Sequence, residues 1–155
     1  MKKTGKYISY FLKNGTIVST IALIMSVLMQ IYGRFLMENA PSWTEEASRL
    51  FFIYAISFAS GLAYKQNYFV FLDLISTKIN AKNDLLLEKI VHGLVFILFL
   101  IIAVFSIFYI NLGLAEKSPS MGMNMSISFA SIFLMAFSIC FFSAQKIIQL
   151  QRKKI

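Results

Sequence analysis

Clusters of Lys and Arg alternate along this chain with long stretches that contain no charged side chain. Of the 15 Lys and Arg residues, 12 fall in three clusters: Lys2, Lys3, Lys6 and Lys13; Lys65, Lys78, Lys82 and Lys89; and Lys146, Arg152, Lys153 and Lys154. Loop Lys and Arg mark the cytoplasmic side of a membrane protein. The pattern therefore predicts an all-α integral membrane protein with four transmembrane helices and with the N and C termini and the middle loop in the cytoplasm.

The composition agrees with a chain whose main solvent is lipid. Hydrophobic residues make up 58% and charged residues only 14%, which is too apolar a mixture for a soluble core of 155 residues. The net charge of +8 is compatible with nucleic-acid binding. The basic residues flank apolar spans, however, where attraction to anionic headgroups explains them. We therefore expect membrane lipids, and no nucleic acid, as partners.

The predicted spans cover residues 16–33, 42–64, 90–112 and 124–144 of a single membrane domain, 1–155. The first apolar run is long and no A-x-A-like cleavage site follows it, so we expect an uncleaved signal anchor. For the second span we expect Ser42 as the N-cap and Glu45 at the capping-box position. Gly113 is the expected C-cap of the third span.

The segment between the second and third spans, 65–89, is too mixed for a further crossing and too apolar for a free loop. Its apolar residues recur at helical spacing, and polar ones fall on other sides. The pattern predicts an amphipathic interfacial helix over about 66–80, with a short membrane-resting linker as the alternative. The residues that define this helix are Tyr68, Leu72, Asp73, Ile75 and Ile79.

The spans lack the groups that most membrane enzymes and proton-coupled carriers need. Every Asp, Glu, Lys and Arg lies at a span end or in a loop, which argues against a multidrug exporter with a membrane carboxylate. His92 is the only histidine and Cys140 the only cysteine, so neither a haem protein nor a disulfide enzyme is expected. We expect no enzyme activity and no catalytic, metal, cofactor or substrate site in this chain.

Small residues recur at helical spacing in the second span and form a mildly polar stripe in the first. Such rows let membrane helices approach closely. Packing within this chain would explain them, and a sharper hypothesis makes them the interface for helices of a larger partner. The residues of this hypothesis are Ala55, Ala59, Ala63, Ser19 and Ser26.

Charges of both signs, with a tryptophan suited to the headgroup level, lie at the predicted outer ends of the first two spans. Ion pairing and anchoring of the topology would explain them, and docking of a soluble partner on this periplasmic rim is the alternative. The residues concerned are Arg34, Trp43, Glu45, Glu46 and Arg49.

The order of these features resembles a known family. A basic N-terminus, Arg34, then Pro41-Ser42-Trp43-Thr44-Glu45-Glu46 leading into a span with Gly61, is similar to the small membrane subunit (the Q, or DctQ-like, component) of tripartite ATP-independent periplasmic (TRAP) transporters. Val70, Leu72 and Asp73 fit the family pattern after that span, whereas Phe69 stands where histidine is common. Ser118-Pro119 with Met121-Gly122-Met123 resembles the third loop of the family.

The resemblance implies a division of labour that fits the missing intramembrane charges. A large multi-span membrane subunit would carry the substrate and sodium sites, a periplasmic binding protein would deliver an acidic solute, and this chain would support the large subunit in the bacterial inner membrane. The sequence is most similar to sialic acid systems, with C4-dicarboxylate systems next. The alternative is a self-contained membrane protein, either a homo-oligomeric channel or the scaffold of an unrelated complex.

Overall fold

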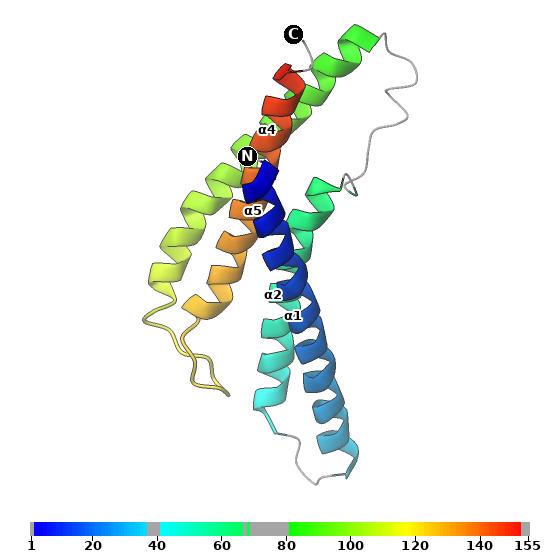
Figure 1. The fold of residues 1–155 in the computed structure, drawn as a ribbon. Coiled ribbons are helices and arrows are strands. Elements are labelled where there is room, and N and C mark those ends of the chain that lie inside the picture. Colours follow the sequence, from blue (N-terminus) through cyan, green and yellow to red (C-terminus); the bar gives the residue numbers. More distant parts are fainter. Residues whose placement is uncertain (1, 37–40, 67, 69–80, 153–155) are drawn as a thin grey trace.

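The computed structural model describes residues 2–36, 41–66, 68 and 81–152, with side chains described for 5–36, 41–66, 68 and 86–151. Most of this part of the chain is helical, as Figure 1 shows. The helices are α1 (Lys2–Leu36), α2 (Trp43–Lys65), α4 (Ala81–Leu112) and α5 (Ser126–Arg152). The all-α expectation with four long helices is therefore confirmed.

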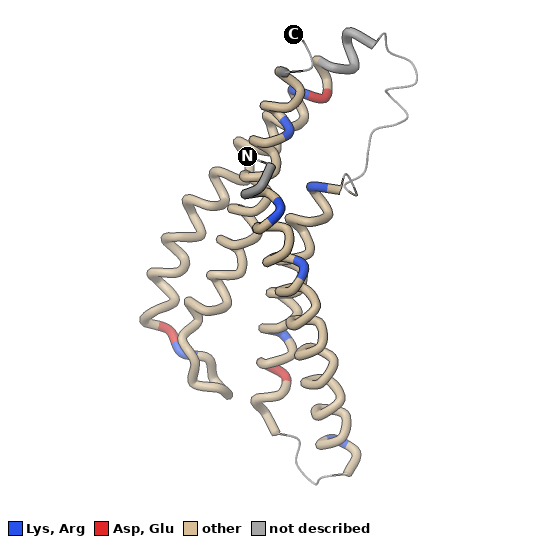
Figure 2. Tube along the Cα trace, in the orientation of Figure 1, with Lys and Arg blue, Asp and Glu red and all other residues tan. Residues whose placement is uncertain are grey.

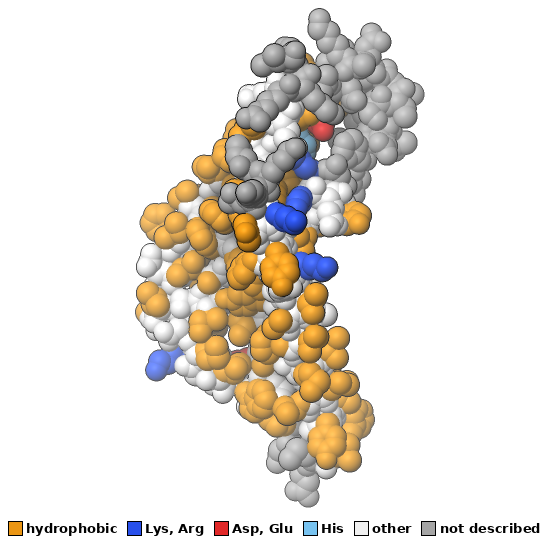
Figure 3. Space-filling model, viewed as in Figure 1, with side chains coloured by type: hydrophobic (Ala, Val, Ile, Leu, Met, Phe, Trp, Pro, Cys, Tyr) orange, Lys and Arg blue, Asp and Glu red, His pale blue; other side chains and the backbone are white. Residues whose placement is uncertain are grey.

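All four helices are long and apolar enough to cross a membrane. The shortest, α2, has 23 residues and spans roughly 35 Å at about 1.5 Å per residue, more than the hydrocarbon thickness of about 30 Å. Charged residues lie toward the two ends of the helices and leave an uncharged middle (Figure 2). On the face drawn in Figure 3, that middle region is covered mostly by hydrophobic side chains.

The helices pack in the order α1, α2, α5, α4, because the extensive contacts join α1 to α2, α2 to α5 and α5 to α4. Two ends of the molecule can be distinguished in Figure 1. The terminal end holds the start of α1, the end of α2, the start of α4 and the end of α5. The loop end holds the end of α1, the start of α2 and the connection from α4 to α5. Within the most apolar 18-residue stretch of each helix, the share of buried residues is 33% in α2 and in α5, 11% in α1 and 6% in α4.

Within residues 5–36 of α1, whose side chains are described, one residue in every seven is buried: Gly5, Leu12, Ser19, Ser26 and Gly33. A seven-residue period is the signature of helices that cross at a shallow angle of about 20° and interlock side chains. Four of these five residues are small, so α1 can approach its neighbours closely. The mildly polar stripe predicted in the first span is thus a packing face.

Three helices meet closely at Gly61 of α2. A methyl group at this position would lie 2.5 Å from Oγ of Ser138 on α5 and 3.1 Å from a methyl group of Leu12 on α1. Directly beside this crossing lies the buried core of Leu12, Tyr64, Ile139 and Phe142. The absence of a side chain at position 61 is therefore what allows α1, α2 and α5 to converge toward the terminal end.

The expected position of Ser42 at the start of α2 is confirmed, but its side chain does not cap the helix. Ser42 lies at the N-cap position with helical dihedral angles, φ −59° and ψ −27°, and its side chain makes no capping hydrogen bond. The hydroxyl of Thr44 donates to the carbonyl oxygen of Pro41 at 2.8 Å, and the backbone N–H of Thr44 donates to the same oxygen at 3.1 Å. The side chain of Glu45 forms an ion pair with Arg49.

Gly113 directly follows α4, and its N–H donates to the carbonyl oxygen of Tyr109 at 2.9 Å. A methyl group at this position would lie 2.5 Å from the backbone nitrogen of Ser126, so close approach to the start of α5 requires the glycine. The expected interfacial helix over 66–80 falls almost entirely on residues 67 and 69–80, which lie outside the described residues. Of its named members only Tyr68 is described, and it is exposed; Leu72, Asp73, Ile75 and Ile79 are outside.

Candidate functional site

The predicted rim residues Trp43, Glu45, Glu46 and Arg49 all lie in the first two turns of α2, and Arg34 lies in the last turn of α1. They therefore gather at the loop end. Glu45 and Arg49 form an ion pair of 3.2 Å whose side chains are 67% and 70% exposed. Exposed pairs of this kind contribute only about 0.2–1 kcal/mol, so this one is more available for contact than important for stability.

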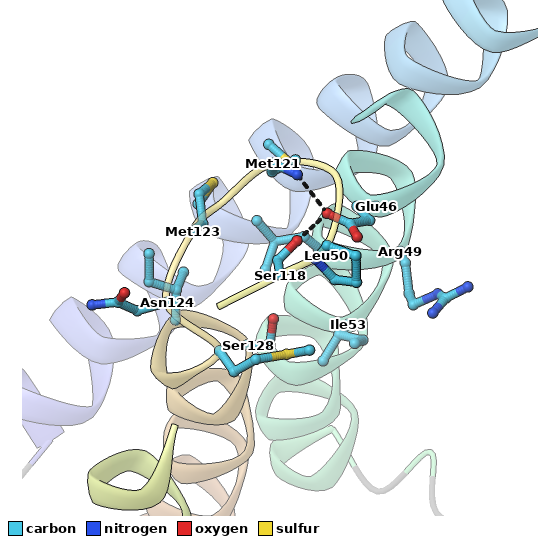
Figure 4. A pocket seen from close by; sticks show the side chains of 12 residues that line it. Glu46, Arg49, Leu50, Ile53, Ser118, Met121, Met123, Asn124 and Ser128 are labelled. Atoms are coloured by element: carbon cyan, nitrogen blue, oxygen red, sulfur yellow. Dashed lines mark hydrogen bonds between the residues drawn. The ribbon is translucent and has the colours of Figure 1, made fainter. Parts of the chain in front are cut away.

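The side chain of Glu46 points in a different direction, toward the connection between α4 and α5 (Figure 4). Its carboxylate accepts a hydrogen bond from the hydroxyl of Ser118, one from the N–H of Ser120 at 3.0 Å and one from the N–H of Met121 at 2.9 Å. These donors belong to the connection between α4 and α5. Glu46 thus attaches that connection to the start of α2.

The connection itself, residues 113–125, is held in shape by backbone hydrogen bonds. The N–H of Ser118 donates to the carbonyl oxygen of Met123 at 2.8 Å, and that of Gly122 donates to the carbonyl oxygen of Ser118 at 3.0 Å. Gly122 has φ +65°, a backbone conformation that favours glycine. The segment is therefore a built turn, which Glu46 places relative to α2.

A cavity of about 350 Å³ lies beneath this turn, between α2 and the start of α5. Figure 4 shows the side chains that line it. Most of them are apolar: Leu50, Ile53, Pro119, Met121, Met123, Met125 and Ile127. Lower on the same helices, the hydroxyl of Tyr54 donates to the carbonyl oxygen of Ile127 at 2.7 Å. Glu46 thus bonds α2 to the turn, and Tyr54 bonds α2 to the start of α5.

A second polar cluster lies at the terminal end and joins three helices. The hydroxyl of Tyr64 on α2 donates to Oγ of Ser143 on α5 at 3.0 Å, and the Ser143 hydroxyl donates to the carbonyl oxygen of His92 on α4 at 2.8 Å. The Tyr64 oxygen also lies 2.6 Å from Nδ1 of His92. His92 is therefore a structural hydrogen-bonding residue.

Two lysines complete this end of the molecule. Nζ of Lys146 donates to the carbonyl oxygen of Tyr64 at 2.9 Å and lies 4.7 Å from the centre of the Tyr64 ring. Nζ of Lys65 donates to the hydroxyl of Ser9 on α1 at 2.7 Å. Both lysines therefore satisfy groups of neighbouring helices while they keep positive charge at the terminal end.

The small residues expected to receive a partner divide into two groups. Ser19, Ser26 and Ala55 are buried within this chain, with exposed fractions of 7%, 8% and 9%. Ala59 and Ala63 are only partly buried. The first three residues thus serve packing between helices of this chain, and the contact of any of the five with a partner stays a prediction.

Comparison with known protein families gives a match over residues 23–153 to the model of tripartite ATP-independent periplasmic transporters, DctQ component. The chain belongs to the DctQ family. The match covers most of the chain, from α1 to the end of α5. No curated protein matches the sequence.

Membership in the DctQ family makes the chain a small membrane component of a TRAP transporter and places it outside the enzyme families. DctQ components work with a large TRAP membrane subunit and a periplasmic binding protein. Together with its four apolar helices, the family makes it a multi-pass membrane protein.

The sequence placed the rim charges at the correct end of α2. It did not show that Glu45 and Arg49 form an exposed ion pair while Glu46 binds the turn at residues 118–121. The turn at Ser118-Pro119 was recognisable in the sequence, but nothing in the sequence indicated that this turn contacts Glu46 of α2. The cluster of Tyr64, His92 and Ser143 was missed as well, because its members are 28 and 51 residues apart along the chain. Only the packing of the helices brings them together.

Proposed function

We propose that this DctQ chain is the static scaffold of a sodium-driven, binding-protein-dependent transporter for an acidic solute. The observation that carries the proposal is that polar contacts join the helices at both ends of the molecule. Glu46 and Tyr54 connect α2 with α5 and its preceding turn at the loop end, and Tyr64, His92 and Ser143 connect α2, α4 and α5 at the terminal end. A membrane body attached at both ends is suited to support a moving neighbour.

The absence of charge in the middle of the four helices supports the same division of labour. Residues 14–33, 50–64, 90–112 and 126–145 contain no Asp, Glu, Lys or Arg. Ionisable groups in mid-membrane are the usual carriers of ion and substrate pathways. In our proposal the sodium and solute sites therefore lie in the large subunit, and the sodium gradient is used there.

In this proposal the terminal end faces the cytoplasm of a bacterial inner membrane, because most Lys and Arg residues lie toward it. The interfacial helix over about 66–80 lies along that surface. The loop end then faces the periplasm and contributes to docking of the binding protein, with the exposed Glu45 and Arg49 among the contacting residues. The best candidate solute is sialic acid, followed by C4-dicarboxylates.

The accessible small residues of α2 leave surface for the large subunit. Among the five candidate interface residues, Ala59 and Ala63 remain partly accessible on α2. Small residues allow close approach of a second helix. We propose that this stretch of α2 faces the large subunit.

The test is sodium-driven uptake of radiolabelled sialic acid, or of a C4-dicarboxylate, into proteoliposomes. The large subunit is reconstituted with and without this chain, and the binding protein is supplied in both cases. We expect uptake only when this chain is present. Equal uptake without the chain would contradict an obligatory scaffold, and uptake independent of a sodium gradient would contradict the proposed energy source.

A further inference from the structure

Glu46 is a charged residue on an exposed rim whose carboxylate is already engaged inside the chain. Both of its oxygens accept hydrogen bonds, and the donors lie 72 to 75 residues further along the sequence. Hydrogen bonds to a carboxylate are roughly twice as strong as neutral ones. Glu46 is therefore an attachment point for the turn at residues 118–121.

The neighbours of this attachment have the opposite character. Glu45 and Arg49 are exposed on α2, and Glu116, Lys117 and Ser120 are exposed on the connection between α4 and α5. We call these five residues the loop-end surface. One part of this surface lies on α2 and the other on the connection between α4 and α5. Glu46 touches both parts, because it lies in the same helix turn as Glu45 and Arg49 and accepts a hydrogen bond from the N–H of Ser120. In Figure 4 the side chain of Arg49 points away from the turn while that of Glu46 points to it.

The geometry points to Glu46 as a positioning residue for docking. We propose that Glu46 holds the 118–121 turn against α2, so that the two parts of the loop-end surface are presented together to the periplasmic binding protein. The inference rests on the docking role proposed above for this end of the molecule. Glu46 acts through the turn and makes no contact with the partner.

The cavity beneath the turn explains why the turn needs a fixed attachment. It provides about 350 Å³ of space lined by flexible apolar side chains, among them Met121 and Met123 of the turn itself. Methionine side chains adapt easily to new packing. Without the carboxylate the turn can shift toward Leu50 and Ile53, and the exposed Lys117 and Ser120 then move relative to Arg49. Binding would have to reverse that shift, which lowers affinity.

Reach and charge can be separated by two substitutions of one residue. Glu46→Gln keeps the length of the side chain and removes the charge, whereas Glu46→Asp keeps the charge and shortens the side chain by one methylene group. If Glu46 positions the turn, both substitutions weaken binding of the binding protein. If Glu46 contributed only its negative charge to docking, Glu46→Gln would weaken binding of the binding protein and Glu46→Asp would not.

The measurement is the Kd of fluorescently labelled binding protein for the complex of this chain with the large subunit in nanodiscs, with the melting temperature of the complex recorded in parallel. We expect Glu46→Gln and Glu46→Asp each to raise Kd by a factor of roughly 3 to 10, while the large subunit still co-purifies. Ser118→Ala should have a smaller effect, because the N–H groups of Ser120 and Met121 still bond to Glu46.

Double substitutions test the route of the effect. Glu46→Gln combined with Ser118→Ala should be no worse than Glu46→Gln alone, because both remove the same attachment. Glu46→Gln combined with Arg49→Gln should multiply the separate effects, because Arg49 belongs to the contacting surface. Multiplicative behaviour of the Glu46 and Ser118 pair would overturn the inference.

Other outcomes separate this inference from the docking role itself. An unchanged Kd in Glu46→Gln, with Kd raised by Arg49→Gln or Lys117→Gln, overturns the positioning role and leaves docking intact. Wild-type affinity in Glu46→Asp with weakened binding in Glu46→Gln assigns a direct charge effect and overturns it too. If none of these variants changes Kd, or if the wild-type complex does not bind, both the docking role and the positioning role fail.

Discussion

The hydroxyl of Tyr64 on α2 lies 2.6 Å from Nδ1 of His92 on α4. The α2 and α4 helices are separated by α5 in the packing order, so this bond crosses the row of helices. Ser143 of α5 lies between them and bonds to both residues. The terminal end is thus closed by a buried polar cluster in which each member supports the other two.

Removal of the Tyr64 hydroxyl should destabilise the chain. In Tyr64→Phe, Nδ1 of His92 loses its partner in a buried site where His92 is 8% exposed. An unpaired buried polar group costs about 1–3 kcal/mol, so we expect a lower melting temperature of the purified chain in detergent. Tyr10→Phe, at a 68% exposed position on α1, is the control. Equal melting temperatures of the two variants would contradict a stabilising cluster.

Gly61→Ala should separate α2 from α5. The new methyl group would lie 2.5 Å from Oγ and 2.7 Å from Cβ of Ser138, so the helices must move apart. Overpacking of this kind costs about 1–3 kcal/mol. Gly93→Ala is a matched control, because a methyl group there meets no atom within 4 Å. The thermal unfolding of both variants checks this, and addition of Ser138→Gly should partly restore Gly61→Ala.

The ion pair of Glu45 and Arg49 should matter little for stability. Both side chains are about two-thirds exposed, at 67% and 70%, and exposed pairs contribute about 0–1 kcal/mol. We expect Arg49→Gln to leave the melting temperature near that of the wild type in both low and high salt. A large loss of stability would show that Arg49 has a structural role beyond this pair.

Ala59→Leu should weaken association with the large subunit. The position is partly accessible on α2, and a leucine would keep a neighbouring helix at a greater distance. We expect less large subunit to co-purify and a lower rate of uptake, while the isolated chain remains folded. Val104→Leu, at a 48% exposed position of α4, is the control. Undiminished co-purification of Ala59→Leu would place the interface elsewhere.

The orientation can be tested by labelling single cysteines in intact cells, after Cys140 has been replaced by alanine. Ser120→Cys lies at the loop end and Gln66→Cys directly after α2 at the terminal end; both positions are exposed. A maleimide that does not cross the inner membrane should label position 120 in intact cells. It should label position 66 only after permeabilisation. The reverse pattern would invert the proposed topology.

The candidate site could be predicted only in part from the sequence. The pattern of charges located Glu45, Glu46 and Arg49 at one end of α2, and the spacing of small residues indicated close helix packing. The opposite roles of the adjacent Glu45 and Glu46 could not be inferred, because neighbours on a helix differ by about 100° in direction and only the surrounding helices show which direction is occupied. Likewise, burial of Ser19 and Ser26 within the chain depends on where α2 lies.

The sequence by itself determined the class of the protein and the four spans, because the cost of placing charges and unpaired backbone groups in lipid leaves helices as the simplest way to cross a membrane. It also carried the family, through motifs that remain readable in the linear order of residues. The tertiary structure decided the packing order of the helices, the convergence at Gly61, and the partners of Glu46 and Tyr64. Each of these depends on close contacts between residues distant along the chain, and local sequence patterns do not encode such contacts.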